Sequence, residues 1–188
     1  MRLKTGRERR FDFQNQISTG SPEAKWMLGM LLELGDRLFD QVEHLPHEVL
    51  NAAPPGSYLT ASRIILHVIQ SEIRRLRLVT ELEEQSYFPL VADAASENFE
   101  TLQTEAIDSV EILKRHLAFR RRVFTSCCSD VGFLDEPVND PSLPDRRAVL
   151  GHLIWHWSFH SGHIGAVTLE MGYEYNWTSA AKARSEPD

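Results

Sequence analysis

Four of the eight histidines of this 188-residue chain fall within twelve residues near its C-terminal end. His152, His156, His160 and His163 follow one another at spacings of four, four and three positions. On an α-helix of 3.6 residues per turn, this spacing places all four rings along one stripe. A stripe of imidazoles is unfavourable to bury without partners. The pattern therefore predicts a helix here, and it indicates that some of these rings bind a metal.

Histidines four residues apart on a helix can bind one ion together, because they are neighbours and a metal–nitrogen bond is about 2.0–2.1 Å long. His152 and His160 are separated by roughly 12 Å of helix rise and cannot share an ion. The usable pairs are His152/His156, His156/His160 and, more tightly spaced, His160/His163. The pattern leaves these pairs open, and each of them needs a third ligand from another element.

His67 is the best candidate for that third ligand. It falls between Ile64, Ile65, Val68 and Ile69, on the apolar side of another predicted helix. A single histidine in such a place is more often a hydrogen-bonded core residue, and this alternative stays beside the metal interpretation. Its occurrence together with the histidine stripe favours a role as ligand.

Apolar residues recur at helical spacing in four segments, and no β-type alternation of useful length is present. A capping serine followed by a proline marks the first start, and Gly172 is the predicted C-cap of the last helix. The predicted helices run from Ser21 to about Leu45, from Thr60 to before Phe88, from Glu97 to Thr125, and from Asp145 to about Met171. The sequence therefore predicts an all-α four-helix bundle, whose topology is left open by its long connections.

Length and charge favour one domain that does not bind nucleic acid. The expected organisation is a basic, flexible N-terminal arm over residues 1–21, the bundle over 22–178 and a frayed C-terminal tail over 179–188. A docking role is the alternative for the arm. The net charge of -7 argues against nucleic acid as the main partner, since phosphates require a basic surface.

Cysteine usage and hydropathy favour a cytoplasmic protein. Cys127 and Cys128 are adjacent, and neighbouring cysteines rarely bridge each other, so no disulfide framework is expected. No apolar run follows the basic residues at the start of the chain, as a signal peptide would require. No stretch approaches the roughly 18 apolar residues of a membrane span, so no membrane partner is expected.

Two segments resemble motifs of the DinB/YfiT-like superfamily. The closing motif of that family has an apolar stretch, then His, three residues, His, a basic residue, Gly, Gln and Ile. The matching segments are Leu59–Glu72 in the second predicted helix and Val149–Ile164 in the fourth, and the order of elements matches over about residues 22–175. Ser161 replaces the common basic residue and His163 the common glutamine, so the family's substrate contacts do not carry over at these two positions.

The resemblance implies a four-helix bundle with a divalent metal held by His67, His156 and His160. Three imidazoles suit zinc, nickel, iron and copper alike, so the identity of the metal stays open. The superfamily includes thiol transferases that use bacillithiol, mycothiol or glutathione, together with a thiol-dependent isomerase. A low-molecular-weight thiol is therefore the cosubstrate that the resemblance implies.

Three functions are consistent with these observations. The first is a metal-dependent enzyme that transfers a low-molecular-weight thiol to an electrophilic small molecule. The second is a metal-dependent hydrolase, and the third is a non-catalytic, metal-containing stress-response or binding protein. The sequence does not separate the first two, because both need an activated nucleophile at an open site. It assigns no catalytic residue.

Weaker predictions concern the surroundings of the site. Contacts with a small-molecule substrate are predicted for Trp155, Trp157, His163 and Tyr173, and core packing is the alternative for the aromatic residues. Glu72, one turn past His67, is by default a solvated helix residue and alternatively an acceptor for a ligand ring. A homodimer stays open as an alternative to a monomer.

Overall fold

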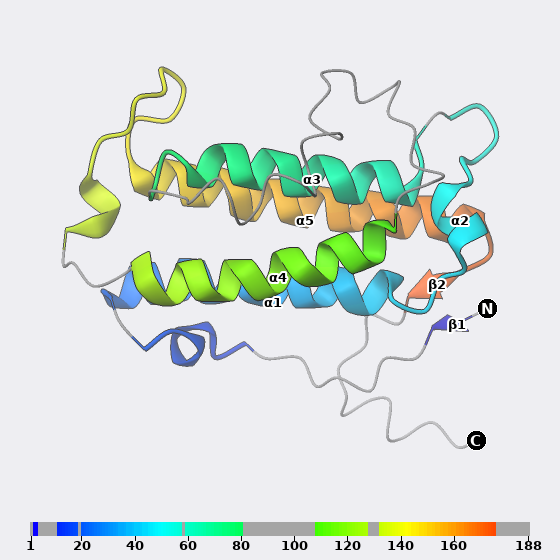
Figure 1. Ribbon diagram of the computed structural model, residues 1–188, viewed down its shortest axis with the longest axis horizontal. Coiled ribbons are helices and arrows are strands. Elements are labelled where there is room, and N and C mark those ends of the chain that lie inside the picture. The colour runs from blue at the N-terminus through cyan, green and yellow to red at the C-terminus, as the bar shows by residue number, and fades with distance from the viewer. Residues whose placement is uncertain are drawn as a thin grey trace.

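The computed structural model describes residues 2–3, 11–18, 20–57, 59–80, 108–127 and 132–175 (Figure 1). These ranges hold five α-helices, two 3-10 turns and two short strands. In chain order the elements are β1 (Arg2–Leu3), η1 (Phe13–Gln16), α1 (Pro22–Val42), α2 (His47–Asn51), α3 (Ala61–Leu76), α4 (Ser109–Cys127), η4 (Phe133–Asp135), α5 (Arg146–Glu170) and β2 (Glu174–Tyr175).

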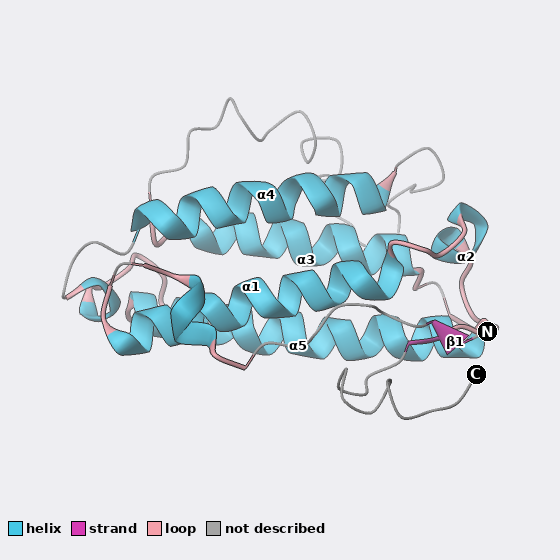
Figure 2. Cartoon of the chain, turned by 90° about the horizontal axis from the view of Figure 1, so that it is seen from below, coloured by secondary structure: helices cyan, strands magenta, loops and turns pink. Residues whose placement is uncertain are grey.

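The four long helices α1, α3, α4 and α5 form an elongated bundle, as the sequence predicts (Figures 1 and 2). Around the bundle, α1 lies beside α5, α5 beside α3, α3 beside α4, and α4 beside α1. The colour gradient of Figure 1 shows that α1 and α5 run in one direction and that α3 and α4 run in the other. α5 is therefore antiparallel to α3, the neighbour that carries His67.

Side-chain caps fix the starts of three helices at the predicted places. Ser21 Oγ accepts a hydrogen bond from the backbone N–H of Ala24 at 3.2 Å, and Thr60 Oγ1 accepts one from Arg63 at 3.1 Å. Asp145 does the same for α5, with 2.7 Å to the N–H of Ala148. These bonds satisfy backbone donors that the first turn of a helix leaves without a partner.

The end of α5 also follows its predicted chemistry. Gly172 has φ of +83°, a left-handed conformation that glycine adopts without a steric penalty. The backbone N–H of Gly172 donates to the carbonyl of Leu169, and that of Tyr173 donates to Thr168. The two bonds close the helix and turn the chain toward β2.

The structure differs from the prediction in where some helices begin and end. α3 ends at Leu76 rather than before Phe88, and the chain continues through i→i+3 bonds of Leu78 and Val79. The predicted start of the third helix at Glu97 lies outside the described residues, and α4 is described from Ser109. The short helix α2 was not predicted, because five residues are too few to show a helical period.

The two short strands and η1 bring parts of residues 1–21 against the bundle. β1 pairs in parallel with β2, Arg2 opposite Glu174. η1 packs on α1 so closely that a Cβ at Gly29 would lie 2.0 Å from the carbonyl oxygen of Phe13. The predicted tail over residues 179–188 lies outside the described residues, and the predicted domain limits stay a prediction.

A buried ionic cluster lies inside the bundle. Arg120 of α4 donates from Nη1 to Glu72 Oε2 of α3 at 3.0 Å, and both side chains are fully shielded from solvent. His116 Nε2 lies 3.3 Å from the same carboxylate oxygen. The guanidinium carbon of Arg120 lies 4.4 Å from the ring centroid of Trp157 on α5. One cluster therefore joins three of the four long helices.

The remaining long helix, α1, leaves room for this cluster because it has a glycine at the point of contact. A Cβ placed at Gly35 of α1 would lie 1.6 Å from Arg120 Nη2 and 2.5 Å from Leu117 Cδ2. The guanidinium cannot move aside freely, because it is buried and hydrogen-bonded to Glu72. Any side chain at position 35 would displace the cluster.

None of the helices in the described ranges is long and apolar enough to cross a lipid bilayer.

Two glycines in helix interiors provide a matched test of this packing. We expect Gly35→Ala to lower the free energy of unfolding by about 1–3 kcal/mol, because the added methyl group overpacks the Arg120 cluster. Gly162→Ala on α5 should instead raise the free energy of unfolding by about 0.5–1 kcal/mol through helix propensity, because within the described ranges no atom from outside its own turn of helix lies within 4 Å of the new Cβ. Urea unfolding of both variants measures the difference, and a Gly35→Ala protein as stable as wild type would contradict the packing argument.

Candidate metal centre

The histidine stripe of α5 lies at the boundary between the core and the surface. On the core side of the stripe, Leu153, Trp157 and Ile164 are completely buried. His156 is 7% exposed, whereas His160 is partly exposed. The stripe faces α3, and α3 carries His67 at the same level of the bundle.

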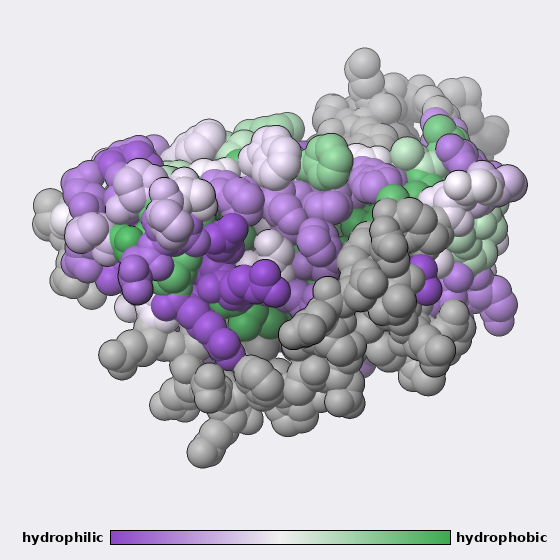
Figure 3. Space-filling view, turned by 90° about the horizontal axis from the view of Figure 1, so that it is seen from above, coloured by the Kyte–Doolittle hydropathy of each residue, from purple (hydrophilic) through white to green (hydrophobic). Residues whose placement is uncertain are grey.

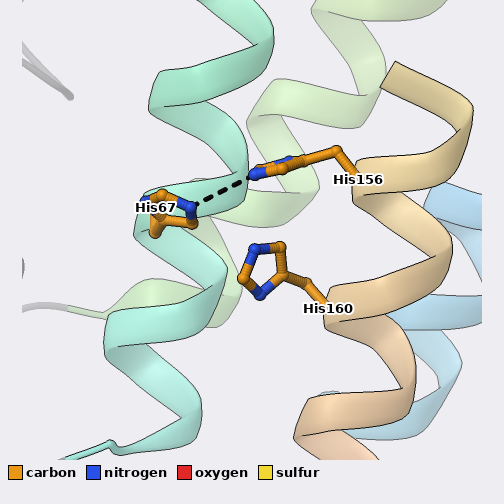
Figure 4. A group of neighbouring side chains, drawn as sticks. All are labelled: His67, His156 and His160. Carbon is orange, nitrogen blue, oxygen red and sulfur yellow. Dashed lines mark hydrogen bonds between the residues drawn. The ribbon is translucent and has the colours of Figure 1, made fainter. Parts of the chain in front are cut away.

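Three of the histidines converge between the two helices (Figure 4). Nε2 of His67 lies 3.2 Å from Nε2 of His156. The ring centroid of His160 lies 4.8 Å from that of His67 and 4.5 Å from that of His156. One nitrogen from each ring lies within 4.8 Å of the others. The structure thus selects His156/His160 among the pairs that the sequence left open.

The geometry fits a single ion. Two nitrogens bound to a tetrahedral zinc at 2.0–2.1 Å are separated by about 3.3 Å, close to the distance between His67 and His156. Nδ1 of His156 and of His160 is shielded from solvent and has no hydrogen-bond partner in the described part of the chain. A third nitrogen within 4.8 Å needs only a side-chain adjustment of His160 to complete the set.

Burial keeps these rings neutral, which is the form that binds a metal. Burial, together with the neighbouring imidazoles, lowers the pKa of His156 to about 4 and that of His160 to about 3. The pKa of His67 is also lowered, first by burial and then by the charge of Arg74. At neutral pH all three rings are therefore in the unprotonated form that binds a metal.

The other two histidines of the stripe flank the triad without joining it. The ring of His152 stacks on His156 at a centroid distance of 5.7 Å, and that of His163 stacks on His160 at 6.1 Å. In the described residues, the group that could hold a metal contains only His67, His156 and His160. His152 and His163 extend the imidazole stripe by one ring on each side.

The predicted substrate residues lie in three different environments. Trp155 is 58% exposed, and its ring lies 6.4 Å from that of His156. Trp157 is completely buried against Arg120 and His116, so the prediction that it contacts substrate is wrong. It points into the core because it lies about 100° around the helix from His156. Tyr173 follows the end of α5, roughly 15 Å of helix beyond His160, and packs against the core.

Sequence reasoning missed the ionic cluster beside the site. The sequence predicts a solvated Glu72 by default, but its side chain is fully buried. Burial alone would raise the pKa of this carboxyl, but Arg120 and His116 outweigh that effect and lower it. Arg120 follows Leu113, His116 and Leu117 at helical spacing on the inner face of α4. That spacing is the sequence signal that could have predicted a buried Arg120.

Comparisons with known proteins support the fold. No protein-family model matches the chain, and no curated protein matches it. Among solved structures, the chain is similar to YfiT from Bacillus subtilis, with a TM-score of 0.53 and 16% sequence identity. The match covers 84% of this chain and 92% of YfiT, which is described as a probable metal-dependent hydrolase with an unusual four-helix bundle topology. The predicted four-helix bundle is therefore confirmed, and its fold is similar to that of YfiT.

Substitutions separate the triad from the flanking histidines. We expect His67→Ala, His156→Ala and His160→Ala each to remove most of the bound divalent metal, because two imidazoles bind an ion far more weakly than three. His152→Ala should retain it, since that ring lies outside the converging set. Metal analysis of the purified proteins after dialysis measures this. Wild-type metal content in the His156 variant would contradict the assignment.

The lowered pKa values also predict how the metal-free protein responds to acid. In the unfolded chain the histidines take up protons near their ordinary pKa of 6.5, whereas folded His156 and His160 stay neutral to about pH 4 and pH 3. Their contribution to stability is therefore complete above pH 6.5 and is lost progressively as the pH falls toward 4.

Urea unfolding of the metal-free protein at pH 7, 6 and 5 measures this loss. The double variant His156→Leu/His160→Leu should lose less stability over the same interval, because it lacks the two groups that titrate differently in the folded and unfolded states. Equal slopes in both proteins would refute the prediction.

Proposed function

We propose that this chain is a metal-dependent enzyme of the DinB/YfiT-like type that transfers a low-molecular-weight thiol to an electrophilic small molecule. The observation that carries this proposal is the convergence of His67, His156 and His160, three neutral nitrogen donors with no fourth candidate ligand in the described ranges. Such a set is typical of catalytic sites, which keep one coordination position open, rather than of closed structural sites.

A divalent ion such as zinc, nickel or iron in this set would lower the pKa of a thiol or water at its open position. The contribution of the chain is to hold the donors ready. The three rings come from two helices whose packing fixes their separation, and burial keeps them unprotonated. Proton uptake therefore does not compete with ligation at neutral pH.

The nucleophile is expected to come from solution, because the hydroxyl nearest in sequence to the triad is engaged elsewhere. Ser161 follows His160 but is buried, and its hydroxyl donates to Gln41 Oε1 at 3.4 Å. In the proposed reaction, the sulfur of the thiol forms a bond to a carbon of the electrophile. The leaving group departs with the electrons of its bond, and the thiol proton passes to solvent.

Two residues expected to contact substrate keep that role in the proposal. Trp155 is exposed beside His156, and His163 stacks on His160 at the other end of the triad. They border the triad along α5. An apolar electrophile lying there would be partly shielded from water.

Hydrolysis is the second candidate, and it is favoured by the description of YfiT as a probable metal-dependent hydrolase. It requires the same donors and the same open position, with water in place of the thiol. The two reactions differ in their products, because thiol transfer leaves a sulfur–carbon bond and hydrolysis does not.

A single assay distinguishes the two reactions. The metal-loaded protein is incubated with a haloarene or an epoxide, with and without bacillithiol, mycothiol or glutathione, and the products are identified by mass spectrometry. We expect thioether formation that requires both the metal and a thiol. His160→Ala should lower the rate at least about tenfold, because it removes a ligand.

Two controls make the result interpretable. Cys127→Ser and Cys128→Ser should leave the rate unchanged, since the thiol comes from solution. Turnover to a hydroxylated product without thiol would favour hydrolysis, and the absence of any metal-dependent turnover would refute both candidates for these substrates.

A further inference from the structure

Aromatic rings form one edge of the surface above the triad. Trp155 and Phe159 of α5 are 58% and 54% exposed, and their rings stack with centroids 5.6 Å apart and planes inclined by 19°. The ring of Phe159 meets that of His160 edge-on at 5.0 Å. The aromatic surface therefore begins directly at the candidate ligands.

This exposure is unfavourable unless something covers the rings. Large aromatic side chains carry much apolar surface, and burying that surface away from water is favourable. The described residues include five large hydrophobic side chains that are exposed, and Trp155 and Phe159 are the two whose rings contact the triad. Their position suits a ligand that lies beside the triad and covers the two rings.

Polar groups form the opposite edge, on α3. Gln70 and Arg74 follow His67 at three and seven positions, so all three lie on one face of the helix. Arg74 is exposed and forms no ion pair within the described part of the chain. By contrast, its neighbour Arg75 is paired with Asp140 at 2.6 Å. Arg74 is therefore a free cation on the face that carries a candidate ligand.

Gln70 adds a second polar group that is not satisfied. Its Nε2 is shielded from solvent and has no hydrogen-bond partner among the described residues. A shielded amide donor without a partner is unfavourable, because it has lost its hydrogen bond to water. A rotation of this amide toward the surface would let it donate to an acceptor oxygen placed between His67 and Arg74.

The antiparallel arrangement of α3 and α5 places Arg74 beyond the triad on the side of Trp155 and His152, whereas Phe159 lies beside His160. Residues that follow His67 on α3 lie across from those that precede His156 on α5 (Figure 1). Consistent with this, the charge of Arg75 acts on His152 and lowers its pKa, after the larger effect of burial. In the view of this surface from above, hydrophilic side chains form a band, and apolar side chains appear along its upper edge (Figure 3).

We propose that the site binds a small organic anion that carries a flat, apolar group. The flat group lies on Trp155 and Phe159, and the anionic group lies against Arg74, with Gln70 donating a hydrogen bond to it. Roughly 10 Å of helix separates His67 from Arg74, so the anionic group and the reacting atom occupy different ends of one molecule. This assignment gives a substrate class to the proposed function and rests on it only for the identity of the reacting end.

Binding of a model anion tests the assignment without requiring turnover. The probe is 2-naphthalenesulfonate, titrated calorimetrically into the full-length protein with and without zinc. Two comparison compounds each lack one feature: 2-naphthalenemethanol lacks the charge, and methanesulfonate lacks the flat group. We expect the probe to bind about tenfold more tightly than either, since each edge of the surface contributes separately.

Variants assign the two contributions to their residues. Arg74→Gln should lower the affinity for the probe about tenfold and leave the affinity for the neutral alcohol unchanged. Arg115 is an exposed arginine of α4, and Arg115→Gln should change neither affinity. Trp155→Leu and Phe159→Leu should each lower the affinity for both naphthyl compounds. Leu169→Ala, which alters an exposed apolar residue farther along α5, should not.

Three results would overturn the proposal. The first is absence of probe binding, and the second is equal affinity for the probe in Arg74→Gln and wild type. The third is a change of oligomeric state in Trp155→Leu, measured by light scattering, without a change in affinity. That result would assign the aromatic surface to a second copy of the chain. Because binding is read directly, a failed turnover assay would refute the proposed reaction and leave this test intact.

Discussion

The buried ion pair between Glu72 and Arg120 constrains the whole bundle. Two charges without access to water are tolerated only when they are paired and surrounded by further polar or aromatic groups, and removing one partner of such a pair typically costs about 3–5 kcal/mol. Here Trp157 lies under the guanidinium, and Gly35 leaves the space that it occupies. Each of the four long helices therefore supplies one part of the cluster, so their relative positions are fixed by a directional interaction as well as by apolar packing.

That constraint bears directly on the candidate metal centre. Glu72 follows His67 on α3, and Trp157 follows His156 on α5, so the same two helices meet at the ionic cluster on the inside and at the histidines near the surface. A site whose donors come from two helices is only as well defined as the packing between those helices. The cluster therefore holds together the two helices that carry the triad, and the pKa of each triad histidine is lowered mainly by the burial that this packing produces.

Much of the fold was predictable because it depends on local rules. The caps at Ser21, Thr60 and Asp145 lie where the sequence places them, and Gly172 ends α5 as expected. The predicted helix ends that differ from the structure are those without a strong local sequence signal, such as the end of α3. The position of Trp157 was misjudged for a different reason. Proximity in sequence to His156 says nothing about direction, and one residue along a helix turns the side chain from the metal face into the core.

The sequence by itself determined the helices, the stripe of imidazoles and the apolar setting of His67, because each follows from residue spacing along one element. Only the tertiary structure decided that His156 and His160, rather than another pair, meet His67, since that choice depends on the register between two antiparallel helices. It also decided that Glu72 and Arg120 are buried together and that two exposed aromatic rings lie beside the triad. Spacing fixes which side chains share a face, but long-range packing fixes which faces meet.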